Sequence, residues 1–148
     1  MKHIVIILTA VFVLASASLY AQVDLGSLSS NPYLQDSTSN PFGTHGSKYS
    51  PNSINNPYGT YGCKYSNKSA TNPYAIDAPK LYDQNVTYKG KLSTNKYDPD
   101  STSNPYGVYG SKYSPNSINN PYGAGSKYKI DSPTNPFGNG LKIIGSDN

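Results

Sequence analysis

Two side chains have the chemistry of a nucleophile and of a base: the single cysteine, Cys63, and one of the two histidines, His45. A Cys–His site needs the thiol and the imidazole within hydrogen-bond reach, with a third group orienting the base. Both residues, however, occupy positions of an internal 16-residue repeat where another copy has a different residue, Tyr109 in place of His45 and Ser111 in place of Cys63. We interpret both as variants of structural positions and predict no catalytic residue and no enzymatic activity. In an exported protein the thiol could instead pair between chains.

Asp98 and Asp100 are the closest pair of carboxylates in the sequence. Paired carboxylates can cleave glycosidic bonds, and carboxylates with nearby carbonyls can bind calcium, which takes six to eight oxygen ligands. Asp side chains also accept hydrogen bonds from the backbone of their own turn. Pro99 between the pair, and the serines that follow Asp36, Asp100 and Asp131, favour this turn-capping role. We predict no metal site and no cofactor.

Tyrosine is the remaining functional candidate, because the chain has 15 tyrosines and no tryptophan. Rings in register along a repeat could stack on sugar faces, and six at matching repeat positions are the candidate ligand-binding residues: Tyr58, Tyr61, Tyr65, Tyr106, Tyr109 and Tyr113. A lysine ammonium can also pair with a ring, and four dipeptides offer this: Lys48-Tyr49, Lys64-Tyr65, Lys112-Tyr113 and Lys127-Tyr128. The alternative is that the rings form the core, which the scarcity of aliphatic residues favours.

An internal repeat organises the sequence. The tripeptide Asn-Pro-Tyr/Phe has spacings of 16, 16, 32, 16 and 15 residues from its second copy onward, and it begins at Asn31, Asn40, Asn56, Asn72, Asn104, Asn120 and Asn135. A larger duplication by 64 residues matches residues 28–59 to residues 92–123 at 25 of 32 positions, and it aligns Gly26 with Gly90. Units this short must stack on their neighbours to bury a face. We therefore predict two four-unit halves, residues 22–87 and residues 88–148, within one domain.

The local sequence of one unit predicts mostly turns. Residues 104–107 (Asn-Pro-Tyr-Gly) have the preferences of a type I turn, residues 108–113 could be extended, and residues 114–118 have Ser and Pro at the start of a single helical turn. Residues 81–88 are the best β-hairpin candidate. Frequent Pro, Gly, Asn and Ser exclude long helices. The expected fold is mainly β or irregular, a compact small repeat domain of short strands, turns and single helical turns. A largely disordered chain is the alternative.

The first 21 residues have the layout of a signal peptide, with a basic head, an apolar run from Ile4 to Ala15, and small residues before a cleavage site after Ala21 or, less favoured, Ala17. The run is shorter than the roughly 20 residues of a membrane span. We expect a secreted protein, periplasmic or extracellular, without a transmembrane segment after cleavage. Once Lys2 is removed from the 12 basic residues, 11 lysines face 8 aspartates, and Glu and Arg are absent. This charge is too small and dispersed for nucleic acid, which proteins bind through clustered Lys and Arg.

Two runs resemble a group of secreted bacterial tandem-repeat proteins: Asn-Pro-Tyr-Gly-x-Tyr-Gly-Ser-Lys-Tyr-Ser-Pro-Asn-Ser-Ile-Asn-Asn-Pro-Tyr-Gly at residues 104–123, and Tyr-Asp-Pro-Asp-Ser at residues 97–101. The resemblance covers nearly all of the chain after the signal segment. No function is established for that group, so it implies no catalytic or binding residue. Asn52 and Asn116 stand where the resemblance implies Asp, which disfavours a metal site.

These observations favour a non-enzymatic repeat protein that acts as a structural or interaction component of the cell envelope or extracellular space. The abundance of Gly, Tyr and Lys is similar to that of adhesive and matrix proteins. The alternative function is a polysaccharide-binding module that stacks its tyrosines on sugars. Candidate partners are accordingly cell-surface polysaccharide or other envelope components.

Overall fold

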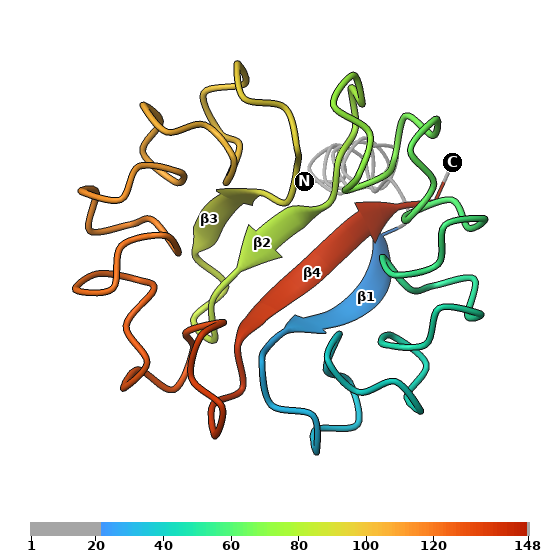
Figure 1. The fold of residues 1–148 in the computed structure, drawn as a ribbon, viewed down its shortest axis with the longest axis horizontal. Coiled ribbons are helices and arrows are strands. Elements are labelled where there is room, and N and C mark those ends of the chain that lie inside the picture. The colour runs from blue at the N-terminus through green and yellow to red at the C-terminus, as the bar shows by residue number, and fades with distance from the viewer. Residues whose placement is uncertain (1–21, 148) are drawn as a thin grey trace, which may run out of the picture.

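The computed structural model describes residues 22–147, and the predicted signal segment, residues 1–21, lies outside these residues. Four strands form one antiparallel sheet: β1 (Gln22–Leu28), β2 (Lys80–Tyr82), β3 (Tyr88–Lys91) and β4 (Leu141–Ser146). Turns make up most of the remaining described chain, and they form two arms on either side of the sheet (Figure 1). We call residues 29–79 the first arm and residues 92–140 the second arm. The fold is therefore mainly β and irregular, as the composition predicts.

Strands from the two halves of the sequence alternate in the sheet, whose order is β1-β4-β2-β3. The ladder of β1 with β4 and the ladder of β3 with β2 have corresponding registers, since Ser27 lies opposite Lys142 and Lys91 lies opposite Lys80. The two halves thus contribute equivalent strands to a common sheet. The predicted hairpin is confirmed, because β2 and β3 are antiparallel neighbours joined by residues 83–87.

Each full-length unit of an arm is a series of five hydrogen-bonded turns, four of which are β-turns and one of which is a residue longer. A residue that ends one turn begins the next, and its N–H donates to the carbonyl three residues back, or four residues back at one step. The turn-starting residues of one unit are Ser37, Asn40, Gly43, Ser47 and Ser50, and Ser53 begins the next unit. Steps of 3, 3, 4, 3 and 3 residues therefore produce the 16-residue period. In the 15-residue unit the step that follows Gly123 has three residues, because the Ser126 N–H donates to the Gly123 carbonyl.

This arrangement confirms one local prediction and corrects two. The turn at residues 104–107 is present, with the last N–H donating to the first carbonyl at 3.2 Å. Residues 108–113 are not extended, because the Ser111 N–H donates to the Gly107 carbonyl and closes another turn. Residues 114–118 form no helical turn, because the Ser117 N–H donates to the Ser114 carbonyl in a β-turn. Ser, Asn and Gly recur at three-residue intervals, and their local hydrogen bonds favour turns over strand or helix.

Small polar side chains fill the interior of the arms. One serine of each unit is fully buried at 0% exposure: Ser37, Ser53, Ser69, Ser101, Ser117 and Ser132. Each of these hydroxyls accepts a hydrogen bond from the N–H two residues further on. The asparagine that starts the following turn donates its amide to the carbonyl six residues back in all six units. Since buried backbone groups need partners, these side chains hold the arms together without an apolar interior.

A small apolar core lies at the sheet. Its buried members are Leu25, Leu81, Leu141, Ile143 and Tyr61, and Leu81 and Ile143 lie opposite each other on β2 and β4. The prediction that stacked tyrosine rings form the core is wrong, because Tyr61 is the one ring among these buried residues. Most other rings stand at the central positions of turns, while the residues that start the turns are directed inward.

Gly26 and Gly90, which the duplication aligns, share a left-handed conformation with φ of 86° and 97°. A side chain at either position would collide with the carbonyl of Asp36 or Asp100 at the first turns of an arm. This close approach lets the Ser27 N–H donate to the Asp36 carbonyl at 2.7 Å, and the equivalent bond in the second half has the same length. Each arm therefore pairs with one end of an outer strand, at Ser27 of β1 or at Lys91 of β3, and covers that part of the sheet edge.

Candidate functional site

Aromatic rings project from the turns of both arms. The central residues of a β-turn point away from its hydrogen-bonded ends, and in two of the five turns of each full-length unit they are Pro-Tyr, Pro-Phe or Lys-Tyr. Twelve rings are exposed over at least 79% of their surface: Tyr33, Phe42, Tyr49, Tyr58, Tyr65, Tyr74, Tyr97, Tyr106, Tyr113, Tyr122, Tyr128 and Phe137. We call these rings, together with Lys48, Lys64, Lys112 and Lys127, the ring surface. Large exposed apolar groups that recur in this way mark interaction surfaces.

Hydrogen bonds at the base of each turn fix the backbone that carries a ring. The Asn56 carboxamide oxygen accepts the Tyr58 N–H at 3.0 Å, and its amide nitrogen donates to the Ser50 carbonyl at 2.9 Å. In three of the four Lys-Tyr turns a serine replaces the asparagine, and the Ser47 hydroxyl, for example, accepts the Tyr49 N–H at 3.2 Å. The rings are therefore presented by an ordered backbone, which lowers the entropic cost of binding a partner.

Four lysines lie over the rings of the tyrosines that follow them. The distances from ammonium nitrogen to ring centroid are 5.4 Å for Lys48–Tyr49, 5.2 Å for Lys64–Tyr65, 5.2 Å for Lys112–Tyr113 and 5.4 Å for Lys127–Tyr128. These are cation–π distances, which lie within about 6 Å. All four lysine–tyrosine pairs expected from the sequence are confirmed, two on each arm.

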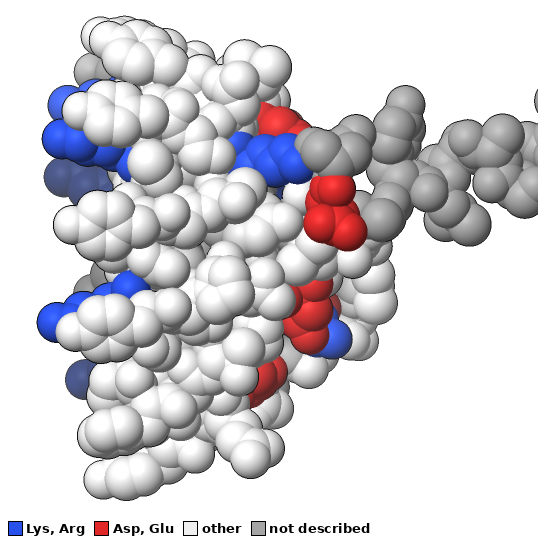
Figure 2. Space-filling model, turned by 90° about the vertical axis from the view of Figure 1, so that its right-hand side faces the viewer, with Lys and Arg blue, Asp and Glu red and all other residues white. Residues whose placement is uncertain are grey.

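Charge is distributed unevenly over the molecule. In Figure 2 several lysine side chains reach the left-hand edge, whereas the visible aspartates lie further to the right. The salt bridges of residues 22–147 involve Lys89 and Lys91, not the four lysines of the ring surface. These four lysines therefore keep their positive charge available to a partner.

A shallow open hollow lies between two successive rings of the first arm. It is lined by Lys48, Tyr49, Asn56, Pro57 and Tyr58. The lysine and its ring come from the turn at residues 47–50, and the asparagine, proline and second ring come from the turn at residues 56–59. Apolar faces, a cation and an amide thus converge on one place, the combination that small-molecule and sugar sites use.

Four of the six candidate binding tyrosines belong to the ring surface: Tyr58, Tyr65, Tyr106 and Tyr113. The other two do not. Tyr61 is 5% exposed, and its hydroxyl donates to the Ser146 carbonyl at 2.9 Å. Tyr109 is half-buried with its ring edge-on to Tyr88, at a centroid distance of 5.5 Å. Both stand in the four-residue step of the turn series, whose extra residue directs the ring toward the sheet. Their assignment as ligand-binding residues is therefore corrected.

Eight further exposed rings were not among the six candidates, although the sequence contained the signal for five of them in the Asn-Pro-Tyr/Phe tripeptides. Tyr33, Phe42, Tyr74, Tyr122 and Phe137 follow Asn-Pro at the position that Tyr58 occupies in its own turn. Their backbone N–H groups donate to the carboxamide oxygen of the asparagine two residues earlier, at distances of 2.9 to 3.0 Å. Every Asn-Pro-Tyr/Phe tripeptide thus adds one ring to the surface.

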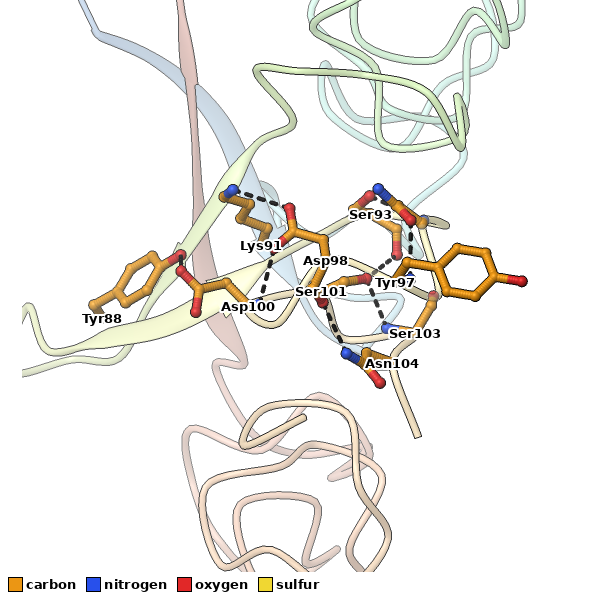
Figure 3. Close-up of polar contacts among 10 residues, drawn as sticks. Tyr88, Lys91, Ser93, Tyr97, Asp98, Asp100, Ser101, Ser103 and Asn104 are labelled. Atoms are coloured by element: carbon orange, nitrogen blue, oxygen red, sulfur yellow. Dashed lines mark hydrogen bonds and ion pairs between the residues drawn. The ribbon is translucent and has the colours of Figure 1, made fainter. Parts of the chain in front are cut away.

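Asp98 and Asp100 connect the second arm to β3 (Figure 3). One oxygen of Asp98 accepts the Asp100 N–H at 2.9 Å, which confirms the predicted cap, and the other pairs with the Lys91 ammonium at 2.9 Å. The Asp100 carboxylate accepts the Tyr88 hydroxyl at 3.1 Å. Asp100 therefore bonds a strand side chain instead of capping its own turn, and Asp36 likewise accepts the Ser27 hydroxyl at 2.8 Å.

The acid–base properties around this contact agree with a structural role. Burial works to raise the pKa of Asp98, but the Asp100 N–H and the Lys91 ammonium outweigh it and hold that pKa below its ordinary value. Burial and the hydrogen bond to Asp100 raise the pKa of the Tyr88 phenol. A glycosidase acid needs a raised carboxyl pKa, and Asp98 has the opposite. Residues 22–147 contain no cluster of three or more His, Cys and Asp side chains that could hold a metal ion.

His45 and Cys63 occupy structural positions in the first arm. The His45 side chain lies against Gly26, as Tyr109 lies against Gly90 in the second half. Cys63 is a half-buried free thiol that starts a turn, the role that Ser47 has one unit earlier.

No protein-family model, no curated protein and no solved structure matches the chain. Within the described residues, no helix is long and apolar enough to cross a membrane.

Proposed function

We propose that this protein is a non-enzymatic interaction module of the cell envelope or extracellular space, and that it binds its partner through the ring surface. The signal-like segment at residues 1–21 supports an exported location. The repeat architecture supports binding to an extended partner, because equivalent groups recur along each arm.

The exposure of the rings is the observation that carries this proposal. Tyr58, Tyr106 and Tyr122 are each 94% to 95% exposed, although a phenol ring buried in a core would contribute substantially to stability. The interior of the arms is filled by serine and asparagine, so the rings are not required there. A chain that places twelve rings in solvent on a hydrogen-bonded framework gains a surface suited to contact with another molecule.

The carboxylates support the non-enzymatic part of the proposal. Asp98 is ion-paired with Lys91, and Asp100 is bonded to Tyr88, so both are engaged in joining the second arm to the sheet. A general acid or nucleophile must be free to reach a substrate in the correct protonation state. Neither carboxylate meets that requirement.

The alternative function, a polysaccharide-binding module, is favoured by the hollow between Tyr49 and Tyr58. Two ring faces and a lysine offer a sugar both apolar contact and polar recognition. This alternative specifies the partner of the same surface and needs no different architecture.

A depletion assay tests the proposed function. The mature chain is incubated with insoluble or immobilised polymers of several classes, and the unbound fraction is measured by tyrosine absorbance. We expect at least one class to deplete the wild-type protein. Replacing Tyr58, Tyr74, Tyr106 and Tyr122 by Ser should abolish this depletion, because each substitution removes an exposed ring and no buried contact.

A matched control replaces exposed aliphatic residues of the same arms, Ile76→Ser and Ile130→Ser, which are 82% and 58% exposed. This variant should bind as the wild type does. The proposal fails if no polymer depletes the wild-type protein, or if the ring variant and the aliphatic control bind equally. Release of soluble products from any polymer would contradict the non-enzymatic assignment.

A further inference from the structure

We infer that the partner of the ring surface is an acidic polysaccharide, and that each arm binds it independently. This inference rests on the proposed function and specifies its ligand.

The first argument is charge complementarity at the rings themselves. Each Lys-Tyr pair places an ammonium group within 5.4 Å of a ring centroid. A uronic acid residue has an apolar C–H face and a carboxylate on the same ring, so it can contact a tyrosine face and the adjacent lysine together. The visible aspartates lie away from the lysine-bearing edge in Figure 2, so they do not repel such an anion.

The hollow of the first arm shows how such a ligand would be held. It is lined by Lys48 and Tyr49 from one turn and by Pro57 and Tyr58 from another. The Asn56 side chain at its base is already committed to the Ser50 carbonyl and the Tyr58 N–H. Recognition in the hollow therefore depends on the two rings and the single cation, which fits a sugar carrying one acidic group.

Nucleic acid is the less favoured polyanion. Proteins bind its phosphates with clustered Lys and Arg, and they neutralise many charges at once. This chain has no Arg, and each lysine of the ring surface is separated from the next by a turn series of 15 or 16 residues or by the sheet. Widely spaced single cations match a polymer with isolated carboxylates better than a phosphate backbone.

The duplication explains why each arm should bind independently. Lys48 and Lys64 belong to the first arm, and Lys112 and Lys127 belong to the second. The arms lie on opposite sides of the sheet in Figure 1. One molecule can therefore hold two polymer chains, or two segments of one chain with gain in avidity.

The test compares polygalacturonate with its fully methyl-esterified form, because esterification removes the charge and keeps the sugar backbone. Binding of the mature protein is measured by biolayer interferometry at low and high salt. We expect polygalacturonate to bind at least about tenfold more tightly than the ester, with the difference lost near 1 M salt, where the Debye length is about 3 Å. Replacing all four lysines of the ring surface by Gln should weaken binding about tenfold or more, since exposed charge pairs contribute up to about fivefold each.

The control replaces Lys80 and Lys142 by Gln. These lysines are exposed, occupy equivalent positions on β2 and β4, and pair with no ring in the described structure. The control should bind as the wild type does. Replacing the four ring lysines by Arg should retain binding, which separates the loss of charge from any loss of folding.

Independent binding by the arms is tested with single-arm variants. Lys48→Gln with Lys64→Gln, or Lys112→Gln with Lys127→Gln, should leave one working arm. Each should still bind polygalacturonate, but neither should cross-link it, as measured by turbidity. Turbidity equal to that of the wild type would overturn the two-arm part of the inference.

The outcomes distinguish this inference from the proposed function. Equal binding of polygalacturonate and its ester, with no effect of the four Gln substitutions, refutes the acidic ligand and leaves a ring-mediated interaction module. Tighter binding to single-stranded DNA than to any polysaccharide refutes the ligand class. Absence of binding to every polymer refutes both the inference and the proposed function.

Discussion

The substitution Asn56→Asp tests whether the asparagine amides hold the arms together. Asn56 is 8% exposed, and its side chain donates to the Ser50 carbonyl at 2.9 Å and accepts the Tyr58 N–H at 3.0 Å. Aspartate has the same shape and keeps the acceptor, but it replaces the amide donor by an oxygen that faces a carbonyl oxygen. The Ser50 carbonyl then keeps only its turn hydrogen bond from the Ser53 N–H, and an unpaired carboxylate oxygen is buried facing it, which costs several kcal/mol. We expect a loss of about 3 kcal/mol or more in the free energy of unfolding at pH 7.

The same substitution should make stability depend on pH. Burial and the facing carbonyl disfavour the charged carboxylate, so folding raises its pKa above the unfolded value of about 3.9. A group whose pKa is raised on folding contributes its stability fully below the unfolded pKa and loses it as the pH rises through the folded pKa. The deficit of Asn56→Asp should therefore shrink as the pH falls from 7 to 3, because the protonated acid donates to the Ser50 carbonyl again.

Urea unfolding followed by circular dichroism measures both effects. Asn52→Asp is the matched control, because Asn52 is exposed and its side chain makes no hydrogen bond in the described structure. Its stability should lie within about 0.5 kcal/mol of the wild type. Subtracting the free energy of unfolding of the control from that of Asn56→Asp at each pH removes the pH dependence of the native carboxylates, which both variants share. The reasoning is refuted if the two variants are equally stable at pH 7, or if their difference persists unchanged at pH 3.

Three further perturbations have expected outcomes. Val86→Gly should raise the free energy of unfolding in urea by about 1–2 kcal/mol, because Val86 is held at φ 61° and is exposed. Val108→Gly, at a residue without positive φ, should not stabilise the protein. Equal effects of the two substitutions would contradict the strain at Val86. Tyr88→Phe should make stability fall less steeply above pH 10. The folded protein raises the pKa of Tyr88 above the unfolded pKa of 10.0, so this phenol contributes stability below pH 10 and loses it as the pH rises through the folded pKa. An unchanged alkaline unfolding curve would refute the role of its hydrogen bond to Asp100. Cys63→Ser should raise the melting temperature by a few degrees, because serine at this repeat position accepts a hydrogen bond from the N–H two residues further on. A lower melting temperature would show that packing of the thiol stabilises the turn more than this hydrogen bond does.

The periodic features of this protein could be predicted from its sequence. The 16-residue spacing, the equivalence of Gly26 and Gly90, the hairpin at residues 81–88 and the four lysine–tyrosine pairs depend on local or repeated patterns. Such patterns specify which positions are equivalent. They do not specify which side of the chain faces inward, and the direction of the rings was predicted wrongly for that reason.

The inward side could not be deduced because the arms are not built on hydrophobic periodicity. Ser37, Asn40 and Gly43 stand three residues apart, and their small size and local hydrogen bonds place them inside. The scarcity of aliphatic residues instead favoured the rings as the interior. The pairing of β1 with β4 joins segments from the two ends of the described chain, and short apolar runs do not identify so distant a partner. Four of the six candidate tyrosines nonetheless lie on the ring surface, because equivalent repeat positions have a common environment.

The alternation of strands has a consequence for the origin of the molecule. Neither half can assemble its own sheet, because β1 and β2 are separated by β4, and β4 and β3 are separated by β2. A chain of one half would leave strand edges unsatisfied until a second copy supplied the missing neighbours. Two such chains would regenerate the order seen here as a symmetric homodimer, which gives an ancestral gene product a stable form before its coding sequence was duplicated and fused. Expression of residues 22–87 alone should accordingly give a dimer by sedimentation, or no folded product.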